Sequence, residues 1–366
     1  MTKKRTPTLP IRLGLIGCGG IVKIAHVPSF QALPDVVQVV AVADPVPENR
    51  AEVGDALGVP PSQRYTTHSE LLDRADVDAV SIATPHHLHA AHVIAAAEAG
   101  VAIISEKPMA ASMEQALAIR AAVIRARVPY TIVHNIVHSV PMQEALARLR
   151  SGALGQPFFG RGVSLFNKGP RETQTAASWR NTRATGGGSV ADTCYHEIYS
   201  VEALMGAPIR YVEARVKTMY YDIDVDDMAL LLLEHDNGAL STVSTAWCVP
   251  TPAAEGGRWC EVHAPGGSLR VHHRAQGPFL SFTNAGGWQE VALPGLADPR
   301  ATASARLVGH AGYFEAVCRA LASDATLGAT PLPTTVDTAC HMMAVVEGAR
   351  LASERRQAVA VDELWK

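Results

Sequence analysis

The chain has 366 residues, of which 48% are hydrophobic and 18% charged, so it can bury a substantial core and is not a disordered protein. This length predicts two domains or one large one. The formal net charge of −3 provides no basic field for a phosphate backbone, and nucleic acid is therefore excluded as the main partner.

The cysteines and the N-terminal region indicate the compartment. The six cysteines lie far apart and form no Cys-x-x-Cys pair, which is ordinary for a reducing cytoplasm and supplies no disulfide framework or metal motif. The apolar run near the N-terminus is short and broken by proline and glycine, so we expect no signal peptide. No run reaches the roughly 18 apolar residues that a membrane span requires. We therefore expect a cytoplasmic protein.

The first part of the chain alternates short apolar runs with helical stretches. We expect strands at 11–16, 36–43, 79–83, 101–104 and 130–133, and helices at 89–99 and 113–125. Nearly continuous apolar strands that alternate with helices are typical of a parallel sheet covered on both faces. The sequence therefore predicts a Rossmann-type domain over residues 1–135.

After about residue 150, strand-like runs follow one another. We expect them at 158–166, 210–219, 229–233, 240–247, 260–264 and 269–272, with two closing helices near 311–322 and 337–353. Turns at Asn237-Gly238 and Gly266-Gly267 separate neighbouring runs, as β-hairpins require. The fold class is thus α/β, with an α+β domain over residues 136–366 that is built on a large, mostly antiparallel sheet.

A glycine-rich loop follows the first expected strand. Gly17, Gly19 and Gly20 precede Ile21, and glycines there allow a tight turn and a close approach of the backbone to a pyrophosphate. Val22 takes the place of the third glycine or alanine of the usual pattern, so we expect slightly looser packing of helix on strand. By itself this loop is equally compatible with a plain tight turn.

Asp44 strengthens the nucleotide interpretation, because it ends the second expected strand. A carboxylate there can accept hydrogen bonds from the ribose hydroxyls of adenosine. It would repel a 2′-phosphate, and no basic residue follows before Arg50. NAD is therefore favoured, with NADP as the alternative. A solvated aspartate before a proline turn is the competing explanation for Asp44.

The loop Thr84-Pro85-His86-His87-Leu88-His89 follows the strand expected at 79–83. Ligands of doubly wound sheets bind at such strand ends, so we expect Thr84, Pro85, His86 and His89 to face the cofactor. His89 and His92 could share a helix face as metal ligands. No acidic or sulfur ligand is near them in sequence, and we expect no metal.

The loop Ser105-Glu106-Lys107-Pro108 ends the next strand. A lysine at this edge would lie in the cofactor cleft, where its ammonium can hydrogen-bond a reacting hydroxyl or carbonyl. If Glu106-Lys107-Pro108 stood alone, an exposed lysine before a proline turn would be the better explanation.

Three glycines, Gly186–Gly188, end a later loop, and Ser189 can cap a helix that we expect to run to Met205. Asp192 and His196 are four residues apart, which places them on one face of that helix. This pair is equally compatible with a structural hydrogen bond and with a proton-transfer site.

The acidic run at 222–227 is similar to the start of a calcium-binding loop. Its sixth position is not glycine, and Leu233 stands where such a loop has its glutamate. We therefore expect the run to be the solvated edge of a hairpin.

Together these motifs resemble the Gfo/Idh/MocA family of oxidoreductases, and the resemblance covers nearly the whole chain. It rests on Glu106-Lys107-Pro108 and on Gly186–Gly188 leading to Asp192 and His196, joined by Gly17–Ile21, Asp44, Thr84-Pro85, His89 and Trp179-Arg180. The resemblance implies that Lys107, Asp192 and His196 form the catalytic group. It also implies that Asn135, Trp179 and Arg180 border the nicotinamide and the substrate.

Some positions depart from the family pattern. Besides Val22, Cys194 replaces a usual glycine, Tyr199 takes a position that is often acidic, and His86 stands where asparagine is common. None of these changes removes a member of the implied catalytic group. Cys194 and Tyr199 are expected near the substrate, so the substrate's identity stays open.

The resemblance implies an NAD(P)-dependent oxidoreductase that transfers a hydride between nicotinamide and a secondary alcohol or carbonyl of a sugar, cyclitol or sugar derivative. We expect His196 to be the general base, Lys107 to polarise the same oxygen, and Asp192 to hold an adjacent hydroxyl and the histidine. An aldose–aldose oxidoreductase that retains its cofactor and a nucleotide-sensing regulator remain alternatives. The broad sheet favours a homodimer or homotetramer.

Overall fold

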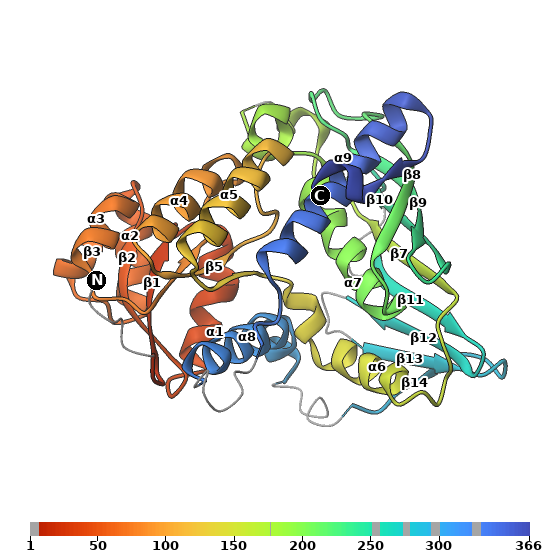
Figure 1. Cartoon of the computed structure of the whole chain (residues 1–366), viewed down its shortest axis with the longest axis horizontal. Coiled ribbons are helices and arrows are strands. Elements are labelled where there is room, and N and C mark those ends of the chain that lie inside the picture. The colour runs from red at the N-terminus through yellow and green to blue at the C-terminus, as the bar shows by residue number, and fades with distance from the viewer. Residues whose placement is uncertain (1–6, 176, 251–256, 274–278, 294–300, 324–330) are drawn as a thin grey trace. The chain divides into compact units, whose positions relative to one another are not determined.

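The computed structural model describes residues 7–366 except 176, 251–256, 274–278, 294–300 and 324–330, and it describes residues 301–308 by their backbone alone. The chain forms two compact units (Figure 1). The first unit consists of Met1–Ala110, Glu114–Asn135 and His310–Cys340, and the second of Ala111–Met113, Ile136–Gly309 and His341–Lys366.

The first unit is built on a six-stranded parallel sheet with the strand order β3-β2-β1-β4-β5-β6. The strands are β1 Ile11–Ile16, β2 Val37–Ala43, β3 Arg64–Tyr65, β4 Ala79–Ile82, β5 Ala102–Ser105 and β6 Tyr130–Ile132. The order reverses between β1 and β4, and sheets of this kind bind ligands outside the carboxyl ends of their strands at that point. The predicted Rossmann-type sheet is confirmed, with β3 as an additional short edge strand.

The helices of this unit cover both faces of the sheet. They are a π-helix Val22–His26, α1 Val27–Gln31, α2 Pro47–Ala56, α3 His68–Arg74, α4 His86–Glu98 and α5 Met113–Ala126. In Figure 1, α4 and α5 lie on one face and α1 on the other. The start of α3 is fixed by a capping box, in which Thr67 Oγ1 accepts the Glu70 amide at 3.2 Å and the Glu70 carboxylate accepts the Thr67 amide at 3.1 Å.

The C-terminal part of helix α8 (Ala301–Ala322) completes the core of the first unit. Tyr313 and Phe314 are fully buried in the cluster that includes β1 and β2, and the Tyr313 hydroxyl donates to the Ile132 carbonyl at 2.7 Å. The sequence assigned all of residues 136–366 to the second domain. The structure instead places His310–Cys340 in the first unit, because the apolar side of α8 covers the sheet there.

The second unit is built on a nine-stranded sheet with the order β14-β13-β12-β11-β7-β10-β9-β8-β15. The strands are β7 Phe159–Leu165, β8 Ile209–Lys217, β9 Met228–His235, β10 Leu240–Ala246, β11 Arg258–Ala264, β12 Gly267–His272, β13 Phe279–Thr283, β14 Gln289–Glu290 and β15 Val359–Ala360. Only the pair β7 and β10 is parallel, so the predicted mostly antiparallel sheet is confirmed. The α-helices of this unit include α6 Val140–Arg150, α7 Tyr195–Met205 and, from His341 on, α9 Val336–Arg355.

Helix α7 lies very close to strand β7. A Cβ atom on Gly162 of β7 would lie only 3.1 Å from side-chain atoms of Glu197 and Val201 on α7. Glycine at this position therefore lets the helix pack directly on the sheet. This close packing fixes the N-terminal end of α7, where His196 is found.

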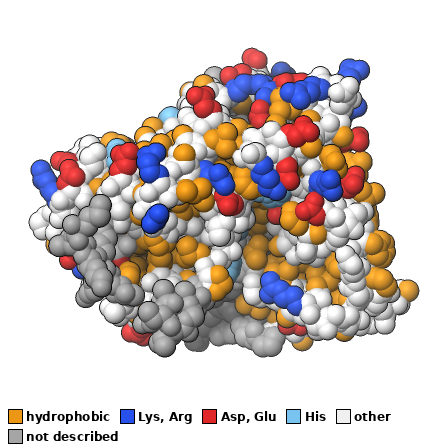
Figure 2. Space-filling model, in the orientation of Figure 1, with side chains coloured by type: hydrophobic (Ala, Val, Ile, Leu, Met, Phe, Trp, Pro, Cys, Tyr) orange, Lys and Arg blue, Asp and Glu red, His pale blue; other side chains and the backbone are white. Residues whose placement is uncertain are grey.

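The surface mixes side chains of every kind. On the face shown in Figure 2, acidic and basic side chains are interspersed rather than gathered by sign. Strand β9 buries Leu231 and Leu233, whereas Leu230 and Leu232 on its other face are 52% and 42% exposed. In the described part of the chain, no helix is long and apolar enough to cross a membrane.

The acidic run at 222–227 is only in part the solvated edge that we expected, because Asp222 and Asp224 are exposed whereas Asp226 and Asp227 are not. Asp227 is fully buried, and its carboxylate accepts the amides of Met219, Tyr220 and Tyr221 at 2.7–2.9 Å. Asp226 accepts hydrogen bonds from the Ser189 hydroxyl at 2.6 Å and from the Val190 amide. The expectation was wrong for Asp226 and Asp227 because backbone amides in this region need acceptors, and the two aspartates provide them.

Candidate active site

The glycine-rich loop adopts a conformation that only glycine permits. Gly17 follows β1 with φ +94°, and a Cβ atom there would lie 2.7 Å from the Ala83 carbonyl oxygen. Gly19 and Gly20 have open space within 4 Å of the corresponding positions, so a ligand can approach their backbone closely. Val22 is fully buried, and the chain makes a π-helical turn from Val22 to His26.

Asp44, at the end of β2, is tied to this loop. Its Oδ2 atom accepts the Cys18 amide at 2.7 Å and its Oδ1 atom accepts the Val46 amide at 2.8 Å. A carboxylate has about four acceptor positions, so ribose hydroxyls can still bind. The guanidinium of Arg50 donates to the Asp44 carbonyl. The first basic residue after Asp44 therefore lies beside it, a contact that could not be predicted from the sequence.

His89 joins the loops that follow β4 and β5. It is fully buried, with Nδ1 at 2.9 Å from the Pro108 carbonyl oxygen and Nε2 at 2.8 Å from the Thr84 carbonyl oxygen. Burial lowers the pKa of His89, although both carbonyl contacts act in the opposite direction. Because both ring nitrogens face carbonyl oxygens, His89 holds the two loops together. His86 is also buried, and His92 Nδ1 lies 3.1 Å from Thr84 Oγ1.

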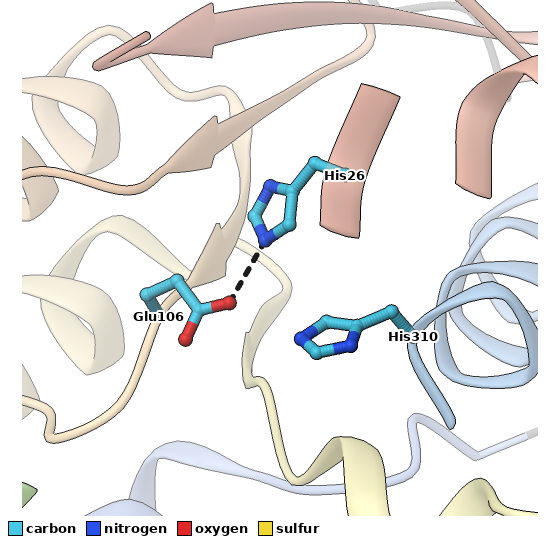
Figure 3. A group of neighbouring side chains, drawn as sticks. All are labelled: His26, Glu106 and His310. Carbon is cyan, nitrogen blue, oxygen red and sulfur yellow. Dashed lines mark hydrogen bonds and ion pairs between the residues drawn. The ribbon is translucent and has the colours of Figure 1, made fainter. Parts of the chain in front are cut away.

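Glu106 lies at the carboxyl end of β5, among two histidines that the sequence analysis did not identify (Figure 3). His26 Nε2 donates to Glu106 Oε1 at 2.9 Å, and the Lys107 amide donates to Glu106 Oε2 at 3.2 Å. Burial raises the pKa of Glu106, but the hydrogen bond from His26 and the charges of His26, His310 and Lys107 lower it to about 2. The buried carboxylate is therefore ionised and anchors the backbone of the Lys107 loop.

The three donor atoms of His26, Glu106 and His310 lie within 4.8 Å of one another, close enough to hold a metal ion. An ionised carboxylate can only accept, so His26 carries its proton on Nε2, and a metal would have to displace that proton. Burial lowers the pKa of His310 to about 4, so its ring is neutral. Its Nδ1 lies 3.4 Å from Asn135 Nδ2, which connects Asn135 to the cluster.

No sequence motif identifies His26 or His310 as members of this cluster. His26 lies on the helical turn after the glycine loop, where a single histidine in an apolar stretch is ordinary. His310 is some 200 residues from Glu106 in sequence, and only the packing of α8 into the first unit brings it there.

In the second unit, Asp192 lies on a π-helix, Val190–Cys194, that leads directly into α7. Ser189 does not cap this helix as predicted, because its hydroxyl donates to Asp226 instead. The four-residue spacing still places Asp192 and His196 about one helical turn apart. Cys194 between them is fully buried, and burial raises its pKa well above the ordinary value.

Asp192 forms an ion pair with Arg180. Arg180 Nε lies 3.1 Å from Asp192 Oδ2, and the guanidinium stacks over Trp179 with its central carbon 4.2 Å from the ring centroid. The Gly188 amide donates to the Arg180 carbonyl at 3.1 Å, which holds the two segments together. The structure therefore brings together Trp179, Arg180, the glycine triplet and Asp192, which the sequence related only through the family resemblance.

The Nδ1 atom of His196 lies within hydrogen-bond distance of Tyr199. The distance from Nδ1 to the Tyr199 hydroxyl oxygen is 2.9 Å, and this oxygen also accepts the Ile136 amide at 3.2 Å. Tyr199 is only 3% exposed, so its ring is held firmly. His196 therefore has a fixed orientation.

The predicted site residues fall into both units. Those in the first unit follow strands of its sheet at their carboxyl ends: Gly17, Asp44, Thr84, Glu106, Lys107 and Asn135. Those in the second unit are Trp179, Arg180, Asp192 and His196.

Residues 11–134 match the model of an oxidoreductase family with an NAD-binding Rossmann fold, and residues 142–270 match the GFO/IDH/MocA C-terminal domain. The chain belongs to the GFO/IDH/MocA oxidoreductase family.

Curated members of the GFO/IDH/MocA family include sugar dehydrogenases. The chain is 30% identical over 240 residues to D-apiose dehydrogenase of Rhizobium rhizogenes, a match covering 64% of this chain and 65% of that protein. It is 28% identical over 263 residues to levoglucosan dehydrogenase of Pseudarthrobacter phenanthrenivorans, covering 64% and 66%. Each match thus covers slightly less than two-thirds of the relative.

Solved structures of the GFO/IDH/MocA fold match almost the whole chain. Levoglucosan dehydrogenase in complex with NADH and levoglucosan has a TM-score of 0.79 at 24% identity, covering 96% of this chain and 99% of that one. An aldose-aldose oxidoreductase from Caulobacter crescentus has a TM-score of 0.79 at 23% identity, with the same coverage. These matches establish the fold.

Proposed function

We propose that the protein is an NAD(P)-dependent oxidoreductase that transfers a hydride between nicotinamide and a secondary alcohol or carbonyl of a sugar, cyclitol or sugar derivative. The observation that carries this proposal is the anchoring of the Lys107 loop by ionised Glu106 at the carboxyl edge of the parallel sheet. Cofactors of doubly wound sheets bind at this edge. The names of the curated relatives, which include inositol dehydrogenases, support the substrate class.

The side chains fit the proton chemistry of such a reaction. When the alcohol is oxidised, a proton leaves its oxygen, and a bound nicotinamide supplies the hydride acceptor. His196 is the proposed general base, and the Lys107 ammonium stabilises the negative charge that develops on the same oxygen. Asp192, held by Arg180, accepts a hydrogen bond from an adjacent hydroxyl.

Both units contribute residues to the proposed dinucleotide site. Gly17, Gly19, Gly20 and Ile21 would approach the pyrophosphate, and Asp44 the adenosine ribose. The other proposed cofactor-binding residues are Thr84, Pro85, His86, His89, Glu106, Lys107 and Asn135 of the first unit and Trp179 and Arg180 of the second. The carboxylate of Asp44 favours NAD. The guanidinium of Arg50 at the Asp44 carbonyl is the feature that would allow NADP.

Two further proposals concern the assembly and the compartment. The exposed Leu230 and Leu232 on the outer face of β9 support a homodimer or homotetramer formed through the second sheet. All six cysteines are free thiols, and five of them are buried, which supports a reducing compartment such as the cytoplasm.

A substrate panel tests the proposed function. Cyclitols, aldoses and anhydrosugars are incubated with the protein and NAD or NADP, and nicotinamide absorbance at 340 nm is followed. We expect reduction of the nucleotide with at least one sugar or cyclitol. Nucleotide binding without turnover on any compound would contradict the proposal and favour a sensor. Nicotinamide absorbance in the purified protein before any addition would instead indicate a retained cofactor.

A further inference from the structure

Lys168, in the loop after β7, has an ammonium group in a fixed position. Its Nζ atom lies 3.3 Å from the ring centroid of Trp247 and donates to Asn181 Oδ1 at 2.7 Å. Both Trp247 and Asn181 are fully buried, and the Lys168 amide donates to the Trp247 carbonyl at 2.8 Å. A lysine with its stem and head held in this way has lost most of its conformational freedom before any ligand binds.

Two independent contacts connect Lys168 to the Asp192 site within the second unit. Trp247, beneath the ammonium, donates from Nε1 to Thr193 Oγ1 at 2.9 Å, and Thr193 is next to Asp192. Asn181 follows Arg180, which forms the ion pair with Asp192. Lys168 was not among the residues that the sequence indicated, because no motif includes it.

The charges around Lys168 do not balance. Among the described residues, the charged groups that act on its ammonium are Asp192 and Arg180, so two cations, Lys168 and Arg180, face one carboxylate. Burial lowers the pKa of Lys168 to about 8, and Asp192 acts in the opposite direction. A half-buried cation is costly unless an anion compensates it, and the carboxylate of Asp192 is already engaged with Arg180.

We propose that Lys168 binds the carboxylate of an acidic sugar substrate, an aldonate or a uronate, beside the Asp192 site. An ammonium has three N–H donors, and among the described residues Asn181 is the hydrogen-bond acceptor of Nζ, so donors remain for a ligand. One carboxylate would compensate the single excess positive charge, whereas a phosphate dianion would leave an excess negative charge. This inference rests on the proposed function and specifies its substrate class.

Matched substrates separate a carboxylate site from a purely structural lysine. We compare kcat/KM for D-glucuronate with that for D-glucose, and kcat/KM for D-galacturonate with that for D-galactose. D-Glucose 6-phosphate tests whether a phosphate is preferred to a carboxylate. With the full chain and NAD, we expect kcat/KM for the uronates to exceed that for the neutral sugars by roughly tenfold or more, since hydrogen bonds to charged groups have effects of this size. A preference for the neutral sugars or for the phosphate would overturn the inference.

Variants of Lys168 test the residue directly. K168M keeps an apolar stem over Trp247 and removes the charge, so kcat/KM for the uronates should fall roughly ten- to a hundredfold while that for neutral sugars changes little. K168R should retain part of the preference. The control K217M makes the same change at an exposed lysine at the end of β8 and should leave the preference unaltered. An equal loss for acidic and neutral sugars in K168M would show a structural role.

A binding measurement keeps this inference distinct from the proposed reaction. Titration of the NADH-loaded protein with D-glucuronate and with D-glucose by calorimetry gives affinities that do not depend on turnover. Tighter binding of the uronate that disappears in K168M supports the carboxylate site even if no oxidation occurs. Equal binding of both sugars by the wild-type protein would overturn the site, whether or not the enzyme oxidises either one.

Discussion

His196 Nδ1 lies 2.9 Å from the hydroxyl oxygen of Tyr199, and this relationship decides which nitrogen can act as a base. The phenol oxygen also accepts the Ile136 amide. If Nδ1–H donates to the phenol, Nε2 is the ring nitrogen that carries a lone pair, and it is the one that could take a proton from the substrate. A carboxylate at this position would enforce the same tautomer more strongly, since it cannot donate.

Tyr199→Phe should reduce kcat by about tenfold and move the acid limb of the pH–rate profile to lower pH. If the hydroxyl accepts Nδ1–H, it favours the imidazolium form, and its loss then favours the neutral ring. The profile of kcat/KM against pH measures this shift. Tyr199→Glu should move the limb to higher pH. A Tyr199→Phe variant with unchanged rate and profile would show that another group orients His196.

His196→Asn should cut kcat by the ~10²–10⁴ typical of a proton-transfer group and remove the acid limb of the profile. Lys107→Met should cause a loss of similar size while nucleotide binding, measured by NADH fluorescence, survives. If both groups serve one oxygen, as we propose, the double variant should lose less than the product of the two effects. An active His196→Asn variant that keeps its pH profile would leave Lys107 as the base.

Asp44→Ala should weaken NAD binding by roughly ten- to a hundredfold and NADP binding by less, since we propose that the carboxylate accepts hydrogen bonds from the ribose hydroxyls and would repel a 2′-phosphate. The dissociation constants of both nucleotides, measured by titration, test this. Arg50→Ala is the companion variant, which should weaken NADP binding more than NAD binding. Wild-type protein that binds NADP more tightly than NAD would refute the assignment of Asp44.

Glu106→Gln should destabilise the protein by about 3–5 kcal/mol at neutral pH, because it removes the ionised partner of His26 from a buried site. The folded-state pKa of about 2 lies below that of an unfolded carboxyl group, ~4.3, so this stabilisation is present above the unfolded pKa and is lost as pH falls toward 2.

The difference in melting temperature between wild type and Glu106→Gln should therefore shrink as the pH falls from about 5 toward 2. Glu315→Gln, at a half-exposed pair with Arg319 on α8, is the control and should change the melting temperature little. A difference for Glu106→Gln that is constant with pH would mean that Glu106 is not ionised in the folded protein.

Dialysis against a chelator should leave activity unchanged, and metal analysis of the purified protein should find no stoichiometric zinc. The hydrogen bond from His26 to Glu106 occupies the position that a metal would need. One metal ion per chain, lost together with activity in His310→Ala, would identify the cluster of His26, Glu106 and His310 as a metal centre.

The sequence predicted those parts of the molecule that follow local patterns. Strand β1 was predicted with its observed bounds, and the residues after β1, β2, β4 and β5 were located because such loops have short, recognisable motifs. The second sheet followed from alternation and turn residues. Its edge strands β14 and β15 are two residues long, too short to carry any periodicity.

Contacts over long sequence distances could not be predicted. Nothing near Glu106 points to His26 or His310, and nothing near Asp192 points to Lys168, because each pairing depends on the tertiary packing of distant segments. The acidic run shows the same limit, since exposed and buried aspartates have one sequence signature. What distinguishes them is the set of amides around Asp226 and Asp227.

The return of His310–Cys340 to the first unit constrains how this protein is made. During synthesis, residues up to Asn135 emerge early but lack Tyr313 and Phe314, so one side of their sheet stays incompletely covered until nearly the entire chain has left the ribosome. The nucleotide-binding half therefore cannot finish folding before the rest is translated. A gene fragment that ends at residue 135 should produce an aggregation-prone polypeptide, and its fusion to other modules would not transfer a working dinucleotide fold.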